Sequence, residues 1–410
     1  MKFERLGEKI TQIRGISYKP NDISATPLTD YVPILKANNI QEEGIVTNDL
    51  IYIHKSKVRP EQFIKKGDLL LAASSGSKEI VGKNIYFESD FEGSFGAFCK
   101  LVRPKQNINA RYLATFFKSV PYKRHIRRLL SGALINNLKN EYIDSLLIPD
   151  ISNSEQIHIA NLLSKAENLI AQRKESIRLL DEFLKSTFSD LFGNPVTNKQ
   201  KFKTVKLKDL TTFLTSGGRG WGEYYSSQGD RFIRSLDVQM NYISEENAAF
   251  VNPPNNQEAN RTKVQDLDIL LTITGSKIGR VAMVPKNFGT AYVSQHVAII
   301  RTRDINPIYL SYYLSDINCG QYLIQKSFYG QTKPGLNFKQ IENFEIIIPP
   351  LELQTQFAQI VEKTEALKTQ YQQSLQELEQ LYGSLSQTAF RGELSVKEIS
   401  VNGTESLHFI

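Results

Sequence analysis

The chain has 410 residues, of which 40% are hydrophobic and 23% are charged, and its formal net charge is +7. This length predicts two to four domains, each with its own hydrophobic core. No run approaches the ~18 uninterrupted apolar residues of a membrane span, and the N-terminus has no apolar signal segment, so we expect no membrane partner. Cys99 and Cys319 have no metal-ligand spacing, which predicts neither a disulfide framework nor a zinc site. We expect a protein of the reducing cytoplasm.

The sequence contains an internal repeat with a shift of about 200 residues. Residues 67–71 match residues 267–271, and a Gly-Ser pair follows each run. Further along, residues 101–103 match residues 299–301 in the same order. Solenoid repeats are only ~20–50 residues long, so a period of this length predicts two duplicated domains.

Each copy begins with a head of mixed α/β character, residues 1–150 in the first copy and residues 196–350 in the second. Short apolar runs bounded by Gly, Asn, Asp or Pro predict strands, and a helical stretch follows the last of them. The predicted strands are residues 31–35, 68–72 and 97–102, then 232–233, 269–273 and 297–301, and the predicted helices are residues 110–130 and 307–328.

A long amphipathic helix follows each head, within residues 151–195 and 351–392, and residues 393–410 form a C-terminal tail. Residues 154–192 contain neither Pro nor Gly, and their apolar positions alternate in steps of three and four, which predicts a heptad seam. At ~1.5 Å per residue, a helix of ~37 residues is roughly 55 Å long. The predicted seam positions are Leu163, Ile170, Ile177, Leu180, Leu184, Val361, Tyr371, Leu375, Leu378 and Leu385.

The two long helices are expected to pair as an antiparallel coiled coil, because a head lies between them in the sequence. Arg173 and Lys368 interrupt the seam, and polar members of a seam specify partner and register at some cost in stability. The alternative is that each helix covers only the core of its own head. A single head cannot bury the whole face of so long a helix, which favours pairing.

The positive charge is concentrated in the two heads. Residues 1–150 contain 23 Lys and Arg against 16 Asp and Glu, and residues 196–350 contain 18 against 13. The two connecting segments and the tail together contain 9 against 14. Basic heads on an acidic scaffold are typical of a polyanion-binding protein, although ordinary surface variation gives similar numbers.

Cations and aromatic residues on the heads are candidates for nucleic-acid contact. Arg124, Arg127 and Arg128 share a face at helical spacing, as phosphate binding requires. Arg219 and Trp221 lie in a Gly-rich loop that suits close approach to a backbone or base. For each candidate the alternative is a solvated loop or helix face. The candidates are Lys19, Lys36, Lys83, Arg124, Arg127 and Arg128 in the first head, and Arg219, Trp221, Arg234, Lys277, Arg280 and Lys326 in the second.

Two motifs look like catalytic sites but lack an essential part. Residues 252–255 read Asn-Pro-Pro-Asn and lack the aromatic fourth residue on which amino-methyltransferases stack a flipped base. Residues 275–277 lack the spacing of a phosphate-binding loop, and no Gly-x-Ser-x-Gly motif is present. We therefore expect no catalytic residue and no metal site. The alternative is an autonomous DNA-modifying enzyme, a degenerate adenine methyltransferase with its site at residues 252–254.

The closing phrases of the two copies carry a family resemblance. The second copy has Gly-Gln-Thr at residues 330–332, Leu-Asn at residues 336–337 and Ile-Pro-Pro-Leu-Glu-Leu-Gln at residues 348–354. The first copy departs from these phrases at residues 132–134 and 149–151. Two basic heads, each closed by such phrases and followed by a long helix, resemble the specificity subunit of a Type I restriction–modification system over nearly the entire chain.

The resemblance implies an α+β fold in which two target recognition domains, residues 1–150 and 196–350, are separated by the antiparallel coiled coil in a pseudo-two-fold arrangement. Each domain is expected to read one half of a bipartite DNA site, and the helices to set the spacer. The implied partners are double-stranded DNA, two methyltransferase subunits docked against the helices, and restriction/translocase subunits. S-adenosylmethionine, ATP and Mg²⁺ are expected on those partners, so this chain would be a non-catalytic subunit without a cofactor.

The two heads differ in their cations, which predicts an asymmetric DNA site. Residues 123–128 contain four cations, whereas the matching residues 321–326 keep only Lys326. Two matching heads would predict a symmetric site. A further hypothesis is a duplicated module that binds another polyanion, which would show no preference between DNA sequences.

Overall fold

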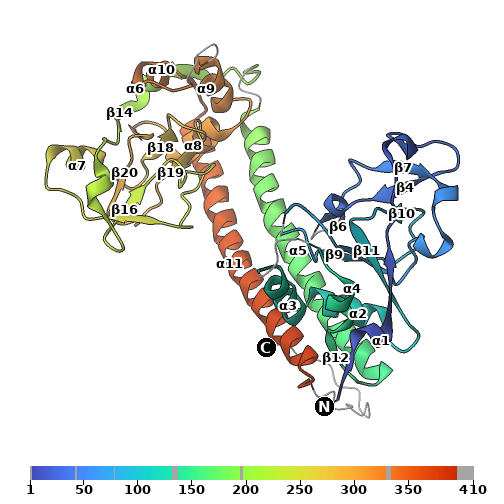
Figure 1. Ribbon diagram of the computed structural model, residues 1–410. Helices are drawn as coiled ribbons and strands as arrows, with labels where there is room; N and C mark the ends of the chain where they lie inside the picture. The colour runs from blue at the N-terminus through green and yellow to red at the C-terminus, as the bar shows by residue number, and fades with distance from the viewer. Residues whose placement is uncertain are drawn as a thin grey trace, which may run out of the picture. The chain divides into compact units, whose positions relative to one another are not determined.

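The computed structural model describes residues 2–41, 44–77, 79–131, 137–193, 197–328 and 334–394 (Figure 1). The described residues form two compact units, one drawn from Met1–Lys174 and Gln373–Ile410 and the other from Glu175–Gln372. Each unit contains one head and a stretch of both long helices. The boundary between the units therefore crosses the helices and does not separate a helix from its head.

The two long helices are α5 (Asn153–Phe192) and α11 (Leu351–Phe390), each of 40 residues. At ~1.5 Å rise per residue, each is about 60 Å long. Gly193 ends α5 with a positive φ of 69°, and its N–H donates to the carbonyl of Ser189 across 2.8 Å. A left-handed glycine is a common helix ending. The expectation of two long helices is confirmed.

The first head is built on two four-stranded sheets. One has the order β10-β4-β7-β3 and includes a parallel β10–β4 pair, and the other has the antiparallel order β2-β11-β8-β9. All of β8 is buried, because alternate residues face two different cores. The strands are β2 (Ile10–Arg14), β3 (Ile23–Ser24), β4 (Tyr31–Leu35), β7 (Ile51–His54), β8 (Leu69–Ala72), β9 (Asn84–Tyr86), β10 (Ser94–Phe95) and β11 (Cys99–Pro104).

Short elements complete the first head. Strand β1 pairs with β12 in antiparallel fashion, so the start of the chain lies against the segment that leads into α5. Strands β5 and β6 form a small separate hairpin. These elements are β1 (Phe3–Arg5), β5 (Ile40–Gln41), β6 (Gly44–Ile45), β12 (Leu147–Pro149), α1 (Leu6–Lys9), α2 (Ala110–Lys118), α3 (Val120–Ser131) and α4 (Asn140–Asp144).

The second head repeats the two four-stranded sheets of the first strand for strand. Its sheets have the orders β14-β21-β18-β19 and β15-β17-β16-β20, and its parallel pair, β16–β20, corresponds to β4–β10. The strands are β14 (Thr211–Ser216), β15 (Tyr225–Ser226), β16 (Asp230–Ile233), β17 (Ala249–Val251), β18 (Ile269–Thr272), β19 (Val281–Met283), β20 (Ala291–Val293) and β21 (Val297–Thr302).

The remaining elements of the second head, apart from α7, also have counterparts in the first. Strands β13 and β22 pair in antiparallel fashion, as β1 and β12 do. These elements are β13 (Lys203–Lys206), β22 (Glu345–Ile348), α6 (Leu207–Leu210), α7 (Gln257–Thr262), α8 (Pro307–Ser315), α9 (Gly320–Phe328) and α10 (Phe338–Glu342).

One ion pair recurs at the same place in both heads. Arg103 of β11 donates to both carboxylate oxygens of Asp68, across 2.8 and 2.7 Å. Arg301 of β21 donates to Asp268 in the same bidentate manner, across 2.7 and 2.8 Å. Both aspartates are buried, so the charge of each needs this partner. The pairs show that the sequence repeat is a repeat of structure.

Two predictions of secondary structure are wrong in detail. Residues 97–102 were predicted as one strand, but β11 begins at Cys99, and Phe98 lies in a turn with 67% of its surface exposed. Residues 110–130 and 307–328 were each predicted as one helix, but each divides into two. The first helix breaks at Ser119, ahead of Pro121, which cannot donate a helical hydrogen bond.

The second break has a different cause. Asp316 leaves the helical conformation, and its carboxylate accepts from the N–H of Asn318 across 2.8 Å. Gly320 then approaches Leu314 so closely that a Cβ on Gly320 would lie 2.2 Å from the Leu314 Cα. Only glycine permits this return of the chain onto the preceding helix.

In the first unit, both long helices contribute to the core of the head. The start of α5 supplies Ile159 and Leu163, and the end of α11 supplies Phe390. The Phe390 ring lies 5.2 Å from the ring of Phe116 and 5.4 Å from that of Tyr112. The head is therefore closed by residues far apart in the sequence.

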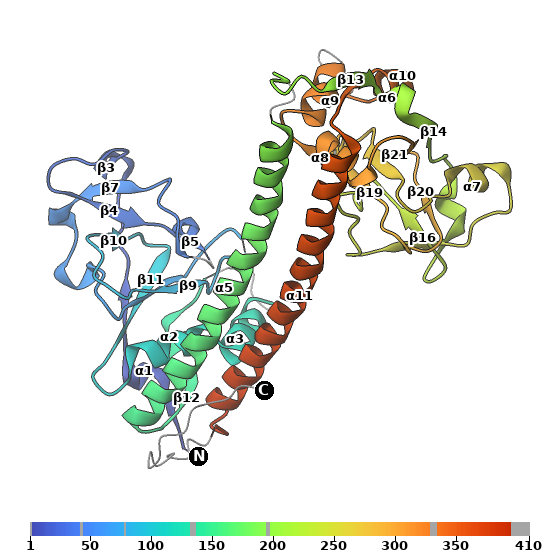
Figure 2. The same ribbon diagram turned by 180° about the vertical axis from the view of Figure 1, so that it is seen from behind.

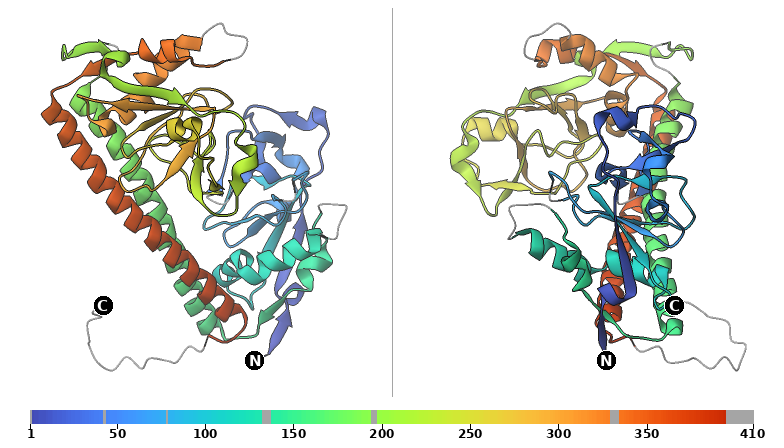
Figure 3. Two further views of the ribbon diagram at one scale, coloured as in Figure 1. Left: turned by 90° about the vertical axis from the view of Figure 1, so that its left-hand side faces the viewer. Right: turned by 45° about the vertical axis from the view of Figure 1, so that its right-hand side comes forward.

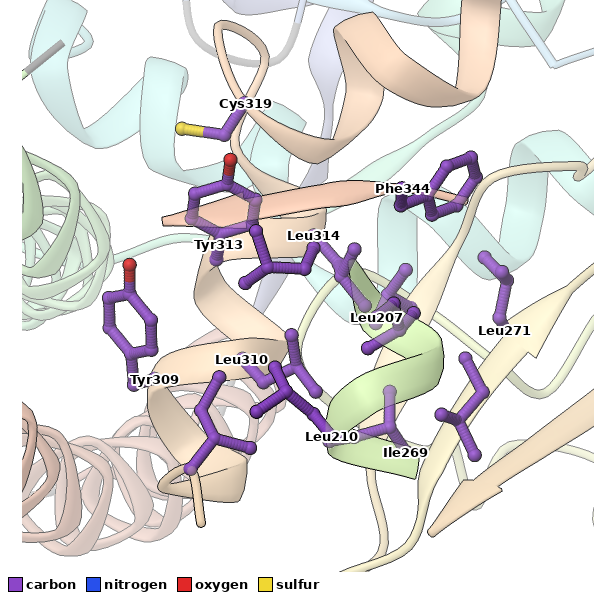
Figure 4. Packing of buried hydrophobic residues seen from close by; sticks show 14 of the residues in the cluster. Leu207, Leu210, Ile269, Leu271, Tyr309, Leu310, Tyr313, Leu314, Cys319 and Phe344 are labelled. Atoms are coloured by element: carbon purple, nitrogen blue, oxygen red, sulfur yellow. The ribbon is translucent and has the colours of Figure 1, made fainter. Parts of the chain in front are cut away.

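The second unit uses the helices in the reverse order. Here the start of α11 supplies Phe357, and the end of α5 supplies Phe188 and Phe192. The ring of Tyr309 lies 4.7 Å from that of Phe192. Figure 4 shows Tyr309 on α8, with its neighbours Leu310, Tyr313 and Leu314 from the same helix.

The long helices pair in antiparallel fashion within each unit (Figures 2 and 3). In the first unit Tyr382 donates to Glu167 across 2.8 Å, and Lys174 lies 2.9 Å from Glu379. In the second unit Lys368 donates to Asp181 across 2.6 Å. The expected coiled coil is confirmed, and the alternative that each helix covers only its own head is wrong.

Burial along the seam differs between the middle and the ends of the helices. Leu163, Leu184 and Val361 are buried where the helices meet the heads. The other predicted seam residues are half-buried, as expected where only two helices meet: Ile170, Ile177, Leu180, Tyr371, Leu375, Leu378 and Leu385. Among the described residues, no helix is both long and apolar enough to cross a membrane.

Candidate nucleic-acid interface

A turn connects the two sheets of each head, and several predicted contact residues surround it. We call residues 96–98 the first turn and residues 294–296 the second turn. The first turn runs from β10 to β11, and the second from β20 to β21. The N–H of Gly96 donates to Leu35, and the N–H of Ser294 donates to Ile233, both across 2.9 Å.

A glycine in each head lets a neighbouring segment close onto the turn. A Cβ on Gly15 would lie 2.1 Å from the carbonyl oxygen of Gly96. A Cβ on Gly217 would lie 2.0 Å from the carbonyl oxygen of Val293. The chain that follows each glycine carries predicted contacts, Lys19 in the first head and Arg219 in the second, and both side chains are exposed.

In the second head the turn forms one wall of a hollow of about 340 Å³. Aromatic side chains form much of its lining, and Arg234 and the second turn supply polar groups. Trp221 is only 5% exposed and stacks on Phe232, with ring centroids 5.0 Å apart, so it does not project to the surface. The lining residues are Gly220, Trp221, Gly222, Tyr225, Phe232, Arg234, Ser235, Ser294, Gln295 and His296.

Arg234 is held in place by an acidic partner. Its Nε and Nη2 donate to the carboxylate of Asp237, each across 3.0 Å, and Nη2 also donates to the carbonyl of Asn247 across 2.7 Å. The Asp237 carboxylate raises the pKa of the Arg234 guanidinium above its usual value. The guanidinium thus has a fixed position at the hollow, and its Nε and Nη2 already donate to protein groups. Lys36, its match in the first head, pairs with Asp49 across 2.7 Å.

A second group of predicted contacts lies on the loop after β8 or β18 and on the helix beside it. In the first head, Tyr122 of α3 donates to the carbonyl of Gly82 across 3.0 Å, which ties the helix to the loop that carries Lys83. One face of α3 is buried through Tyr122 and Ile126. Its other face exposes the cations Lys123, Arg124, Arg127 and Arg128.

The second head keeps this arrangement with fewer cations. Gln321 of α9 donates to the carbonyl of Gly279 across 2.8 Å, and Arg280 follows in the chain and donates to Gln239 across 2.5 Å. Lys277 is exposed. Lys326 lies over the ring of Tyr322 at 6.0 Å and lines a separate hollow of about 600 Å³.

The remaining features of the sequence are the closing phrases, the Asn-Pro-Pro-Asn motif and the two cysteines. Residues 132–136 and 329–333, which hold parts of the closing phrases, lie outside the described residues. Asn252 is exposed at the end of β17, where Asn-Pro-Pro-Asn begins. Both cysteines are buried, and burial raises the pKa of the Cys99 thiol to about 12. Across the described residues, no group of three or more His, Cys, Asp and Glu could hold a metal ion.

The residues of the two turns were not predicted from the sequence as contacts. Phe98 was placed inside a strand, and Gln295 and His296 were not selected. A signal was present: the alignment that matches Arg103 with Arg301 also places Phe98 opposite His296. The residues around this position match in the two copies, but phenylalanine stands in the first and histidine in the second. Such a difference points to a surface position whose chemistry differs between the heads.

Comparison with known proteins agrees with this architecture. Residues 199–380 match the family model described as Type I restriction modification DNA specificity domain. The specificity subunit of the EcoKI Type I restriction enzyme of Escherichia coli K12 is 29% identical over 94% of this chain and 88% of the relative. The StySPI specificity subunit of Salmonella potsdam is 28% identical with the same two coverages. Residues 199–380 thus match this family's domain, and nearly the whole chain is similar to Type I restriction–modification specificity subunits.

Solved structures from Type I restriction–modification systems share the fold. The crystal structure of the Type I restriction–modification S subunit from M. genitalium has a TM-score of 0.59 and 14% identity, over 95% of this chain and 96% of that one. A chain from a study of Type I restriction–modification complex assembly has a TM-score of 0.55 and 19% identity, over 96% and 98%. The likeness in fold therefore covers both heads and both helices.

Proposed function

We propose that this chain is the non-catalytic DNA-recognition subunit of a Type I restriction–modification complex, acting in the cytoplasm. Each head reads one half of a bipartite, asymmetric site in double-stranded DNA, and the paired helices set the unread spacer. The observation that carries the proposal is that the two heads share one fold but expose different side chains. The Asp68–Arg103 and Asp268–Arg301 pairs recur, whereas the cations of α3 have few counterparts on α9.

The cations have the placement that phosphate contact requires. The exposed face of α3 and the loops with Lys83, Lys277 and Arg280 provide positive charge on the two heads. Such contacts fix position on the duplex and make binding depend on salt, but they carry no sequence information. Sequence must be read by side chains that reach base edges.

The helices supply surfaces for the partner subunits. Leu169 and Leu381 are each 51% exposed in the first unit, and Leu179 and Phe183 are each 49% exposed in the second. These apolar side chains lie outside the seam, and a methyltransferase subunit that docks on each unit would cover them. Restriction/translocase subunits join that complex. S-adenosylmethionine, ATP and Mg²⁺ belong to the partner subunits in this proposal.

A methylation assay tests the proposal. The purified chain is incubated with DNA and labelled S-adenosylmethionine, with and without its methyltransferase partner. We expect methyl transfer only when both proteins are present, and the methylated sequence to be one bipartite motif. Transfer by this chain alone would support the alternative of an autonomous DNA methyltransferase, and methylation without sequence preference would contradict the role in recognition.

A further inference from the structure

The two turns have the same backbone but different side chains. In each, the first residue accepts a hydrogen bond from the residue three positions later: Cys99 to Gly96 across 2.8 Å, and Val297 to Ser294 across 3.0 Å. The carbonyl of the last residue accepts a second hydrogen bond from the residue that directly follows β8 or β18. Ala73 donates to Phe98 and Ile273 donates to His296, both across 2.9 Å. With the bonds of Gly96 and Ser294 to β4 and β16, three matching hydrogen bonds fix each turn to both sheets.

The first turn presents an apolar surface. Its residues are Gly96, Ala97 and Phe98, and the phenyl ring of Phe98 is 67% exposed although the neighbouring Cys99 is buried. An exposed aromatic ring costs free energy in water, whereas the frame around it is held by hydrogen bonds. A ring held out in this way suits contact with the methyl group of thymine or insertion at a base step.

The second turn presents hydrogen-bonding groups at the same backbone positions. His296 is held by Thr274, whose Oγ1 lies 2.5 Å from Nδ1, and Gln295 Nε2 lies 3.1 Å from His296 Nε2. The side chain of Gln295 is exposed. Ser294 is 5% exposed, and its hydroxyl has no hydrogen-bond partner among the described residues, although it lines the hollow.

An unpaired buried hydroxyl points to a ligand. Leaving such a group without a partner costs about 1–3 kcal/mol, so a partner that reaches the hollow is expected. Arg234 supplies a fixed cation at the same hollow. A polar group of a base, approached with the phosphate backbone near Arg219 and Lys277, would satisfy the Ser294 hydroxyl and meet Gln295 at its edge.

We propose that these turns are the base-reading elements of the two heads: the first reads through the apolar ring of Phe98, and the second through hydrogen bonds from Ser294 and from Gln295, which His296 positions. This inference rests on the proposed function and names the residues by which it discriminates. The first turn selects a thymine methyl or a deformable base step. The second selects a purine edge, because glutamine can bond an adenine at two positions, and His296, whose Nε2 accepts from Gln295 and whose Nδ1 lies at Thr274, holds that glutamine in place.

The experiment uses the full chain in complex with its methyltransferase partner and a library of random DNA duplexes. The methylated duplexes give the bipartite motif of the wild-type complex. Phe98→Ala should reduce discrimination by about ten-fold or more at one position of one half-site, which is the scale of a good base contact. Gln295→Ala and His296→Ala should do the same in the other half-site only. The double change Ala97→Gln with Phe98→His should shift the first half-site toward a purine.

Matched variants control for general damage. Leu28→Ala removes another exposed apolar side chain of the first head, and Gln228→Ala removes another exposed glutamine of the second head. Neither residue belongs to the first or the second turn. Both should leave the motif unchanged. If all variants of the two turns methylate the wild-type motif, this inference is wrong but the proposed function stands. A wild-type complex that shows no sequence preference overturns the proposed function, and the reading turns with it.

Discussion

Lys368 of α11 donates to Asp181 of α5 across 2.6 Å. This lysine interrupts the predicted apolar seam, and in the second unit it joins the two long helices. Burial by itself lowers the pKa of Lys368, but Asp181 and Glu365 outweigh it and hold the pKa above its usual value. The matching residue of the first repeat is Ile170. There the helices are tied by Tyr382 and Glu167, so the two units fasten the same pair of helices with different chemistry.

The Lys368–Asp181 pair should show measurable coupling. Because both groups are partly exposed, we expect a coupling free energy of about 0.5–1 kcal/mol in a double-mutant cycle of Lys368→Met and Asp181→Asn. Urea unfolding followed by fluorescence is the measurement, since the single tryptophan, Trp221, lies in the same unit. If the two changes had strictly additive effects on the free energy of unfolding, the pair would not determine the register of the two helices.

The end of α11 should be essential to the first head. Phe390 is buried against Phe116 and Tyr112, and truncation of such a ring to alanine costs about 3–5 kcal/mol. We expect Phe390→Ala to increase hydrogen exchange in β8 and β11. The fluorescence-detected unfolding of the second unit should not change.

Leu381→Ala is the control for that experiment. It removes a large apolar side chain from the same stretch of α11, but one that is half exposed and outside the core of the head. It should alter exchange in β8 and β11 by far less than Phe390→Ala. Equal effects of the two variants would mean that the C-terminal end of α11 stabilises the head only through the helix and not through the Phe390 ring.

The sequence predicted the frame because the frame depends on periodic and local signals. Heptad spacing gave both helices, and the matched Gly-Asp-apolar and apolar-Arg runs gave the repeated strands. It did not predict that Phe188, Phe192 and Phe390 complete the heads, since no local signal tells which core a helix end will enter. It also placed Phe98 in a strand, because an apolar run continues to Cys99 and only the tertiary bond to Ala73 reveals the turn.

The stability of the first head should depend on pH through Lys100. This side chain is buried and donates to the carbonyl of Leu138 across 2.9 Å, and burial lowers its pKa to about 8, although Asp144 acts in the opposite direction. Because the unfolded lysine has a pKa near 10.4, the unfolded chain binds more protons between these values. The contribution of Lys100 to the free energy of unfolding therefore rises as pH increases across this window.

The variant Lys100→Met isolates that contribution. Hydrogen exchange of the β11 amides, corrected for the intrinsic rate at each pH, is compared between wild type and variant from about pH 7.5 to about pH 9.5. The wild type should gain stability relative to the variant as pH rises. In the second head Ala298 occupies the matching position, so the β21 amides are an internal control. A constant difference between the two proteins at every pH would contradict the assignment.

Arg234→Ala should change recognition in one half-site only. The guanidinium stands at the hollow of the second head, so its loss should alter affinity or preference there and leave the other half-site unchanged. The change also removes two hydrogen bonds to the buried Asp237, which is expected to cost about 1–3 kcal/mol of stability. The methylated motif is read by sequencing the DNA of a host that carries the chain and its partner.

Two further variants separate recognition from stability at this site. Asp237→Asn disturbs the same pair but keeps the cation at the hollow, so it should destabilise the head with a smaller effect on the motif. Arg303→Ala removes an exposed cation of the same head and should change neither. Equal effects of Arg234→Ala on both half-sites would count against two heads that read separately.

A carboxylate in the seam should disturb the helix pair without unfolding either head. Ile177 and Leu378 are half-buried in the seam, where a charged group loses part of its hydration, so Ile177→Asp or Leu378→Asp should weaken the pairing by about 1–3 kcal/mol. Because the proposed spacer depends on this pair, we expect the variants to relax the spacer length of the methylated motif or to abolish methylation. Gln376→Asp adds the same charge on the exposed side of α11 and should be neutral. Unchanged assembly and an unchanged spacer in both seam variants would show that the coiled coil does not set the spacing.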